Sequence, residues 1–144
     1  MTNSLFNRPG VIALMHFDDG RTIEFSMGVE DMLTGVPINK NSIFDLASVS
    51  KQFTALSILL LEKNGLLNLN NNLFDFIPEV KVLPDNITLE NLIYHTSGLP
   101  CLFDIAEDKG VDYYSPFKTK DIIKGISERK YLKFTPGTRY EYSN

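Results

Sequence analysis

The stretch Phe44-Asp45-Leu46-Ala47-Ser48-Val49-Ser50-Lys51-Gln52-Phe53-Thr54-Ala55 opens a long run in which apolar residues recur at helical spacing. From Val49 to Leu60 the spacing suits a helix with most of its circumference buried. Lys63-Asn64 followed by Gly65 is typical of a helix C-terminus, with the glycine just beyond the last turn. The sequence therefore predicts a central helix that begins at Ser48 and on which the rest of the fold packs.

Ser48 and Lys51 stand three residues apart at the start of this predicted helix. Residues i and i+3 share a helix face, so the serine hydroxyl can lie beside the lysine amine. A nucleophilic serine needs such a base, and a helix N-terminus adds positive potential and unpaired N–H groups. Burial and positive potential both favour the neutral amine, which accepts a proton. The alternative interpretation is a serine cap followed by a surface lysine whose stem packs along the helix.

The same Ser-x-x-Lys spacing occurs twice more in the chain, at Ser115/Lys118 and at Ser127/Lys130. Ser115 is followed directly by Pro116 in a predicted loop. Ser127 lies at a charged helix end, beside Glu128. The Ser48 pair is favoured over both because it alone opens a long apolar helix.

The remaining segments predict a β-hairpin followed by short helices. Residues 11–15 read as a strand buried on both faces, Asp18-Asp19-Gly20 as a tight turn, and residues 22–27 as a strand with one covered face. Short helices are predicted at residues 73–77, stopped by Pro78, from a Thr88 cap to about His95, and from a Thr119 cap to about Lys130. Residues 99–117 read as a loop, and residues 140–144 as a short extended segment.

Composition excludes several classes of function. The 144 residues carry 14 basic and 18 acidic side chains, a net charge of −4, so nucleic acid is not an expected partner. The single cysteine, Cys101, excludes an internal disulfide and a multi-cysteine metal site. His16 and His95 are too far apart to indicate a histidine metal site, and no cofactor or metal is expected. His95 is interpreted as a helix-end residue that bonds local backbone.

No export or membrane signal is predicted. The apolar stretch at residues 58–61 is far too short to cross a membrane. Residues 1–4 lack the charged region and apolar core that begin a signal peptide. The compartment stays open between cytoplasmic and extracytoplasmic.

Four ordered segments together resemble the serine β-lactamase-related family, which includes class C β-lactamases, DD-peptidases and family VIII-like esterases. Residues 44–55 resemble its nucleophile motif. Leu92-Ile93-Tyr94-His95-Thr96-Ser97-Gly98-Leu99 resembles its His-Thr-Ser-Gly-Leu signature. Phe134-Thr135-Pro136-Gly137-Thr138-Arg139-Tyr140-Glu141-Tyr142-Ser143-Asn144 resembles its Pro-Gly loop and Tyr-x-Asn motif. Pro9-Gly10-Val11 with the hairpin resembles its opening strands.

This resemblance implies roles for four residues. Ser48 would be the acylated nucleophile, and its backbone N–H would form half of an oxyanion hole. Lys51 would be the base or would orient it. Tyr142 would assist as phenolate or proton shuttle, and Asn144 would bind the substrate amide or fix Lys51. The resemblance implies acyl transfer on a β-lactam, a D-Ala peptide or a small ester. The alternative is a non-catalytic binding or sensing module with the same fold.

The fold implied by the resemblance is α+β, β-lactamase/transpeptidase-like and truncated. Residues 1–35 would supply a hairpin of the antiparallel sheet, and residues 36–144 most of the helical lobe. The third family motif, Lys-Thr-Gly or His-x-Gly, is not found after Tyr142-Ser143-Asn144. We therefore expect an N-terminal fragment of a single catalytic domain. We expect it to be inactive alone and to self-associate through the truncated sheet edge.

Overall fold

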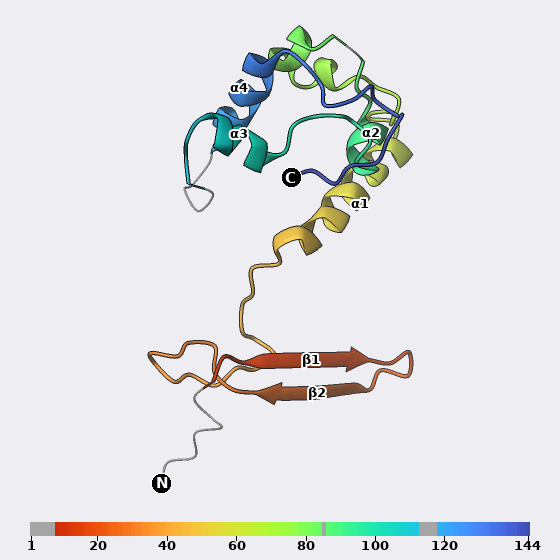
Figure 1. Cartoon of the computed structure of the whole chain (residues 1–144). Helices are drawn as coiled ribbons and strands as arrows, with labels where there is room; N and C mark the ends of the chain where they lie inside the picture. Colours follow the sequence, from red (N-terminus) through yellow and green to blue (C-terminus); the bar gives the residue numbers. More distant parts are fainter. Residues whose placement is uncertain (1–7, 85, 113–117) are drawn as a thin grey trace. The chain divides into compact units, whose positions relative to one another are not determined.

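The computed structural model describes residues 8–84, 86–112 and 118–144. It contains two compact units, the first ending at Ser48 and the second beginning at Val49 (Figure 1). A two-stranded antiparallel sheet precedes a series of helices, which confirms the predicted α+β class. The Ser115 alternative falls outside the described residues.

The first unit is built on the predicted hairpin. Strand β1 (Val11–His16) pairs antiparallel with β2 (Thr22–Met27), with Val11 opposite Met27 and His16 opposite Thr22. The turn depends on Gly20, whose φ of 86° lies in the left-handed region that glycine tolerates best. Its N–H donates to the carbonyl of Phe17 at 2.9 Å and closes the turn. The hairpin prediction is therefore confirmed.

The strand patterns of this hairpin indicate buried faces, but strands that lack further sheet neighbours are expected to expose Val11, Leu14, Ile23 and Phe25. All four side chains are about half exposed. Periodicity reports that a face is apolar but not whether another layer covers it. Within the part of this unit that is described, the buried apolar residues are Val29 and Ile38, which lie beyond the strands.

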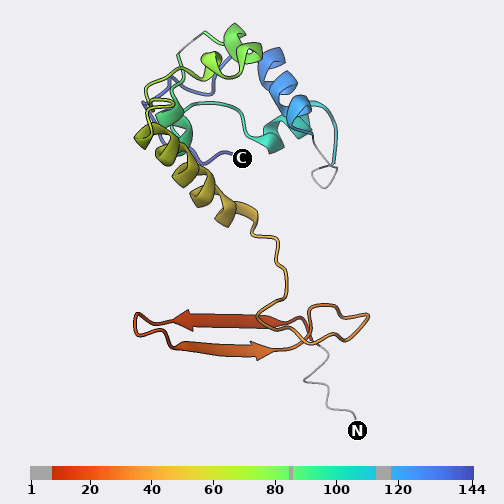
Figure 2. The same cartoon turned by 180° about the vertical axis from the view of Figure 1, so that it is seen from behind.

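The second unit is helical. A 3₁₀ turn, η1 (Ala47–Val49), leads directly into α1 (Ser50–Lys63). Then follow η2 (Leu73–Asp75), η3 (Pro78–Val82), α2 (Leu89–Ile93), α3 (Leu102–Asp108) and α4 (Thr119–Arg129). Figures 1 and 2 both show the C-terminal segment returning to α1, the helix with which this unit begins.

Helix α1 ends as predicted but is not buried as predicted. Asn64 caps it and Gly65 follows with φ of 69°. None of its residues is buried, and Phe53, Leu56 and Leu60 are each about half exposed. The core of the unit lies elsewhere, in a cluster made of Leu73, Val80, Leu83 and Ile87 with partly buried neighbours from α2 and α4.

At two places in the second unit a glycine allows two segments of the chain to pack closely together. Gly125 of α4 packs on Ile105 of α3, where an added Cβ would lie 2.4 Å from the Ile105 side chain. Gly98 packs on the backbone of Phe134, where an added Cβ would lie 2.2 Å from the carbonyl oxygen. The second contact joins the loop after α2 to the loop that precedes the C-terminal segment.

Three further predictions need correction, and one is confirmed. Residues 99–117 are not all loop, because α3 forms within them and is capped by the Asp104 carboxylate, which accepts the Cys101 N–H at 2.7 Å. Pro78 begins η3 instead of only stopping a helix, since proline suits the first helical position. Lys118, not Thr119, is the N-cap residue of α4. Thr88 does cap α2, accepting the Asn91 N–H at 3.1 Å.

Candidate active site

The start of α1 carries the predicted nucleophile and base. Ser48 lies in η1, three residues before Lys51 in the first turn of α1. The turn is formed locally: the Asp45 carboxylate accepts the N–H of Ala47 at 2.8 Å, and Ala47 takes a φ of 44°. Asp45 therefore has a structural role in this turn.

The second unit brings three of the four predicted site residues together. The Lys51 ammonium donates to the Asn144 side-chain oxygen at 2.6 Å, across 93 residues of sequence. The Tyr142 hydroxyl donates to the same oxygen at 3.3 Å. Lys51 Nζ also lies 5.1 Å from the centroid of the Tyr142 ring. One amide oxygen thus links the amine and the phenol, so that their protons can be coupled.

The segment that carries Tyr142 and Asn144 is extended, so its side chains alternate. Glu141 and Ser143 are partly buried, whereas Tyr142 and Asn144 are exposed on the side of Lys51. The inward residues are held by His95: its carbonyl accepts the Glu141 N–H at 2.9 Å, and its ring Nδ1 accepts the Ser143 N–H at 3.3 Å. This pairing decides which two residues of the segment reach Lys51.

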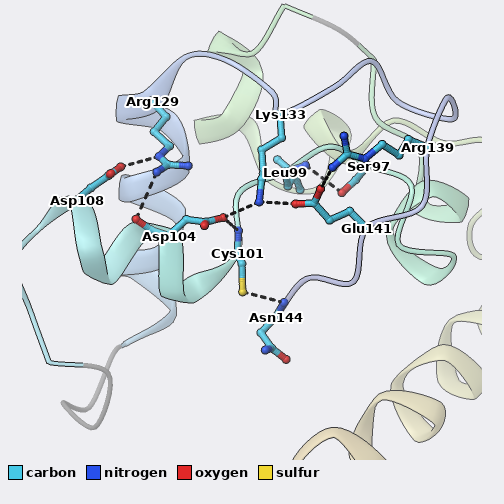
Figure 3. A network of polar contacts seen from close by, with 10 residues as sticks. All are labelled: Ser97, Leu99, Cys101, Asp104, Asp108, Arg129, Lys133, Arg139, Glu141 and Asn144. Atoms are coloured by element: carbon cyan, nitrogen blue, oxygen red, sulfur yellow. Dashed lines mark hydrogen bonds and ion pairs between the residues drawn. The ribbon is translucent and has the colours of Figure 1, made fainter.

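The other side of the segment is anchored by α3 and by charged side chains (Figure 3). The carbonyl of Asn144 accepts the Leu102 N–H at 3.0 Å, and the Asn144 N–H lies 3.5 Å from Cys101 Sγ. Lys133 pairs with Glu141 and, at 3.2 Å, with Asp104. Figure 3 shows the Lys133 ammonium between the two carboxylates, tying the segment to α3.

These contacts shift the pKa values of the groups involved. The hydrogen-bonded Lys133 ammonium lowers the pKa of Glu141, and the two carboxylates raise the pKa of Lys133 above its ordinary value. Partial burial lowers the pKa of His95, and the nearby Lys51 ammonium lowers it further. The His95 ring is therefore neutral near pH 7, in agreement with Nδ1 acting as an acceptor.

A cavity of about 470 Å³ opens beside Lys51 and Asn144. Most of its lining is apolar and comes from α1, α2 and α4, with Ile58, Leu92 and Ile126 among the lining residues. Its polar lining residues include Lys51, His95 and Asn144. An apolar hollow with a few converging polar groups is the usual form of a small-molecule site.

The other residues considered from the sequence are accounted for. The Ser127 hydroxyl donates to the carbonyl of Lys124 at 2.9 Å, and Lys130 ends α4 in a left-handed conformation, so this pair is structural. Cys101 is partly buried. His95 lies at the end of α2 and its N–H bonds the local carbonyl of Leu92, as predicted, but its ring bonds the backbone of Ser143, 48 residues away. Only the resemblance of residues 92–99 to a known signature marked this histidine in advance.

Within residues 8–84, 86–112 and 118–144 there is no group of three metal-ligating side chains and no helix long and apolar enough to cross a membrane.

Comparison with known proteins places the chain in a family. The family model "Beta-lactamase" matches residues 6–144. A penicillin-binding protein of Bacillus subtilis (strain 168) is 41% identical over 75 residues, covering 52% of this chain and 16% of the relative. A beta-lactamase of Yersinia enterocolitica is 28% identical over 141 residues, covering 94% of this chain and 33% of the relative.

The fold is also found among solved structures. A penicillin-binding protein from Bacillus halodurans superposes with a TM-score of 0.71 and 29% identity, covering 92% of this chain and 40% of that one. The chain therefore spans well under half the length of each of these three proteins. Since the family model extends over nearly all of its residues, the chain belongs to the Beta-lactamase family.

Proposed function

We propose that this chain carries the nucleophile, base and proton-shuttle residues of a serine hydrolase or acyl-transfer enzyme. The observation that carries the proposal is the shared hydrogen bonding of Lys51 and Tyr142 to the Asn144 side chain. Ser48 lies three residues before Lys51, on a turn that continues into the same helix. An amine and a phenol that share one hydrogen-bond acceptor, with a serine three residues before the amine, are the residue types needed to move a proton from a serine to a leaving group.

In the proposed reaction the Ser48 oxygen attacks a carbonyl carbon and forms the acyl–oxygen bond. One member of the Lys51 and Tyr142 pair must be deprotonated, as amine or phenolate, to accept the serine proton, and it returns that proton to the leaving nitrogen or oxygen as the amide or ester bond breaks. Water or another nucleophile then attacks the acyl-enzyme and its proton returns along the same route. Asn144 orients the Lys51 amine and stands where it can hydrogen-bond the substrate. No step needs a cofactor.

The substrate class is proposed as a β-lactam, a D-Ala peptide or a small ester. The relatives' names, penicillin-binding protein and beta-lactamase, support the first. The apolar lining of the cavity suits an acyl group with a hydrophobic side chain. A panel of a chromogenic β-lactam, a D-Ala-D-Ala peptide and a p-nitrophenyl ester would separate the three classes by kcat/KM.

The proposal is tested by intact-mass spectrometry of the full-length protein after exposure to benzylpenicillin or a fluorophosphonate. We expect one adduct, which is lost in Ser48→Ala and retained in the matched control Ser127→Ala. An adduct that persists in Ser48→Ala would overturn the assignment. Saturable binding without any adduct would favour the non-catalytic binding module instead.

We also propose that residues 1–144 form part of one catalytic domain, with the hairpin in residues 1–35 and most of the helical lobe in residues 36–144. The much greater length of the relatives supports this. The family resemblance gives the Ser48 N–H as only one half of an oxyanion hole, and an enzyme that lacks one oxyanion donor typically loses about 10²–10³ in rate. Residues 1–144 alone should therefore show no turnover above background, and the exposed hairpin should promote dimers visible by light scattering. Turnover that Ser48→Ala abolishes in the 144-residue chain would refute this.

A further inference from the structure

His95 occupies an unusual backbone position. It follows the cap residue of α2, with φ of 54°. The N–H of Thr96 donates to the carbonyl of Asn91 at 2.8 Å, and the N–H of His95 to that of Leu92 at 3.3 Å. These two bonds form a Schellman motif, in which the left-handed residue is usually glycine because other residues pay a steric cost there. A residue kept in such a conformation points to a role for its side chain.

The His95 side chain lies against the segment that carries Tyr142. Its ring stacks on the Tyr142 ring, with centroids 4.6 Å apart and planes inclined by 36°. It meets the Tyr140 ring edge-on, with centroids 6.1 Å apart. Because the Ser143 N–H can only donate, Nδ1 must be unprotonated, and the neutral ring carries its proton on Nε2.

We propose that His95 is a positioning residue for the acyl transfer, holding Glu141 and Ser143 so that Tyr142 and Asn144 reach Lys51. This inference rests on the proposed function. The carbonyl and the ring of His95 bind alternate residues of an extended segment, which sets the register of the segment. A shift of the segment by one residue would turn Tyr142 and Asn144 away from Lys51.

The same geometry makes the arrangement sensitive to acid. Protonation of Nδ1 would set an N–H donor against the Ser143 N–H and would place a second cation near Lys51. The groups that face the ring are Lys51 from α1 and Tyr140 and Tyr142 from the C-terminal segment. The positive charge of Lys51 opposes an imidazolium at this position and lowers the pKa of His95. The rate of acylation should therefore fall as His95 becomes protonated.

Three variants of the intact protein separate this role from a structural one. His95→Gly removes the ring and relieves the left-handed strain. His95→Asn places its Oδ1 acceptor the same number of bonds from Cα as Nδ1, tolerates the left-handed region and does not titrate. The control is Lys130→Gly, which relieves the same kind of strain at the end of α4, where φ is 57°.

We expect His95→Gly and Lys130→Gly to keep or raise the melting temperature. His95→Gly alone should slow acylation of Ser48, at least ten-fold, through kcat more than KM. His95→Asn should recover much of the rate and lose the acid limb that His95 contributes to the pH profile. An unchanged acylation rate in a folded His95→Gly variant, or an unchanged acid limb in His95→Asn, would overturn the proposal.

One measurement does not depend on catalytic activity, so it tests the role of His95 separately from the proposed function. Nuclear magnetic resonance of the wild-type protein should show the Nε2–H tautomer of His95, and the Ser143 amide proton should shift with the titration of the ring. Failure of the Ser143 amide to follow that titration would overturn the positioning role. If these signals appear but no adduct forms on Ser48, the proposed function fails while the placement of His95 stands.

Discussion

Replacing Gly98 with alanine would place a methyl group where the backbone of Phe134 already lies. The added Cβ would sit 2.2 Å from the Phe134 carbonyl oxygen and 3.2 Å from its carbon. Neither atom can rotate away as the end of a flexible side chain could. The Gly98 carbonyl also accepts the Lys133 N–H at 2.7 Å, so the two segments cannot separate without losing a hydrogen bond.

Two costs add at this position. Gly98 has a φ of 72°, and an alanine there costs about 1–2 kcal/mol in backbone strain. The clash forces a backbone shift, for which overpacking costs of about 1–3 kcal/mol are typical. Together they amount to about 2–5 kcal/mol, a large share of the roughly 5–15 kcal/mol by which a domain is stable.

Gly65→Ala is the matched control. Gly65 has a φ of 69°, but a Cβ there would meet nothing within 4 Å. It therefore reports the backbone strain alone, and any gain from a less flexible unfolded chain is common to both variants. Urea unfolding followed by far-ultraviolet circular dichroism should give a free energy of unfolding about 1–3 kcal/mol lower for Gly98→Ala than for Gly65→Ala. Equal losses in the two variants would refute the steric reasoning.

Three further outcomes are expected. Thr88→Ala should lower the free energy of unfolding by about 1 kcal/mol, with Thr88→Ser as the control that keeps the cap. Partial burial raises the pKa of Asp104, but its hydrogen bonds from Cys101 and Lys133 outweigh burial and leave that pKa below its ordinary value. The resulting stability is present above the unfolded pKa of about 4 and is lost as pH falls through the folded pKa, so Asp104→Asn should flatten the acid limb of a stability-versus-pH curve. Tyr142→Phe should slow acylation by about 10²–10⁴, and an unchanged pH–rate profile would falsify the shuttle role.

Local chemistry allowed several elements to be predicted. The Asp18-Asp19-Gly20 turn and its two flanking strands follow from turn preference and strand pattern. The end of α1 at Lys63 follows from Gly65, and the start of α2 from the Thr88 cap. Each of these signals lies within a few residues of the feature it predicts, so no knowledge of tertiary packing was needed.

Helix α3 shows where local signals conflicted. Pro100 and Gly110 favoured a loop over the whole region, but each lies just outside the seven-residue helix. Within it, Leu102, Ile105 and Ala106 follow the i, i+3, i+4 pattern, and Asp104 can cap the first turn. A pattern this short is a weak signal for a helix when a proline and a glycine lie close to its ends.

Burial could not be predicted from periodicity alone. Phe53 and Leu60 of α1 belong to an apolar pattern typical of a buried helix, yet both are about half exposed. The spacing of apolar residues describes the chemistry of a helix face, whereas burial depends on which other elements pack on it. The same reasoning applies to Leu14 and Phe25 in the hairpin.

Long-range pairing explains why the sequence could suggest candidate site residues but not their geometry. The loop after α2 binds the C-terminal region at four points: Thr96 accepts the Gly137 N–H, Gly98 accepts the Lys133 N–H, and His95 accepts the Glu141 and Ser143 N–H groups. Each bond spans 35 or more residues, so no local pattern reveals it. Because Asn144 reaches Lys51 only at the end of this series, the hydrogen bond between them depends on the backbone of the loop at residues 95–98. Substitutions in that loop should therefore change acylation even where the loop touches no substrate.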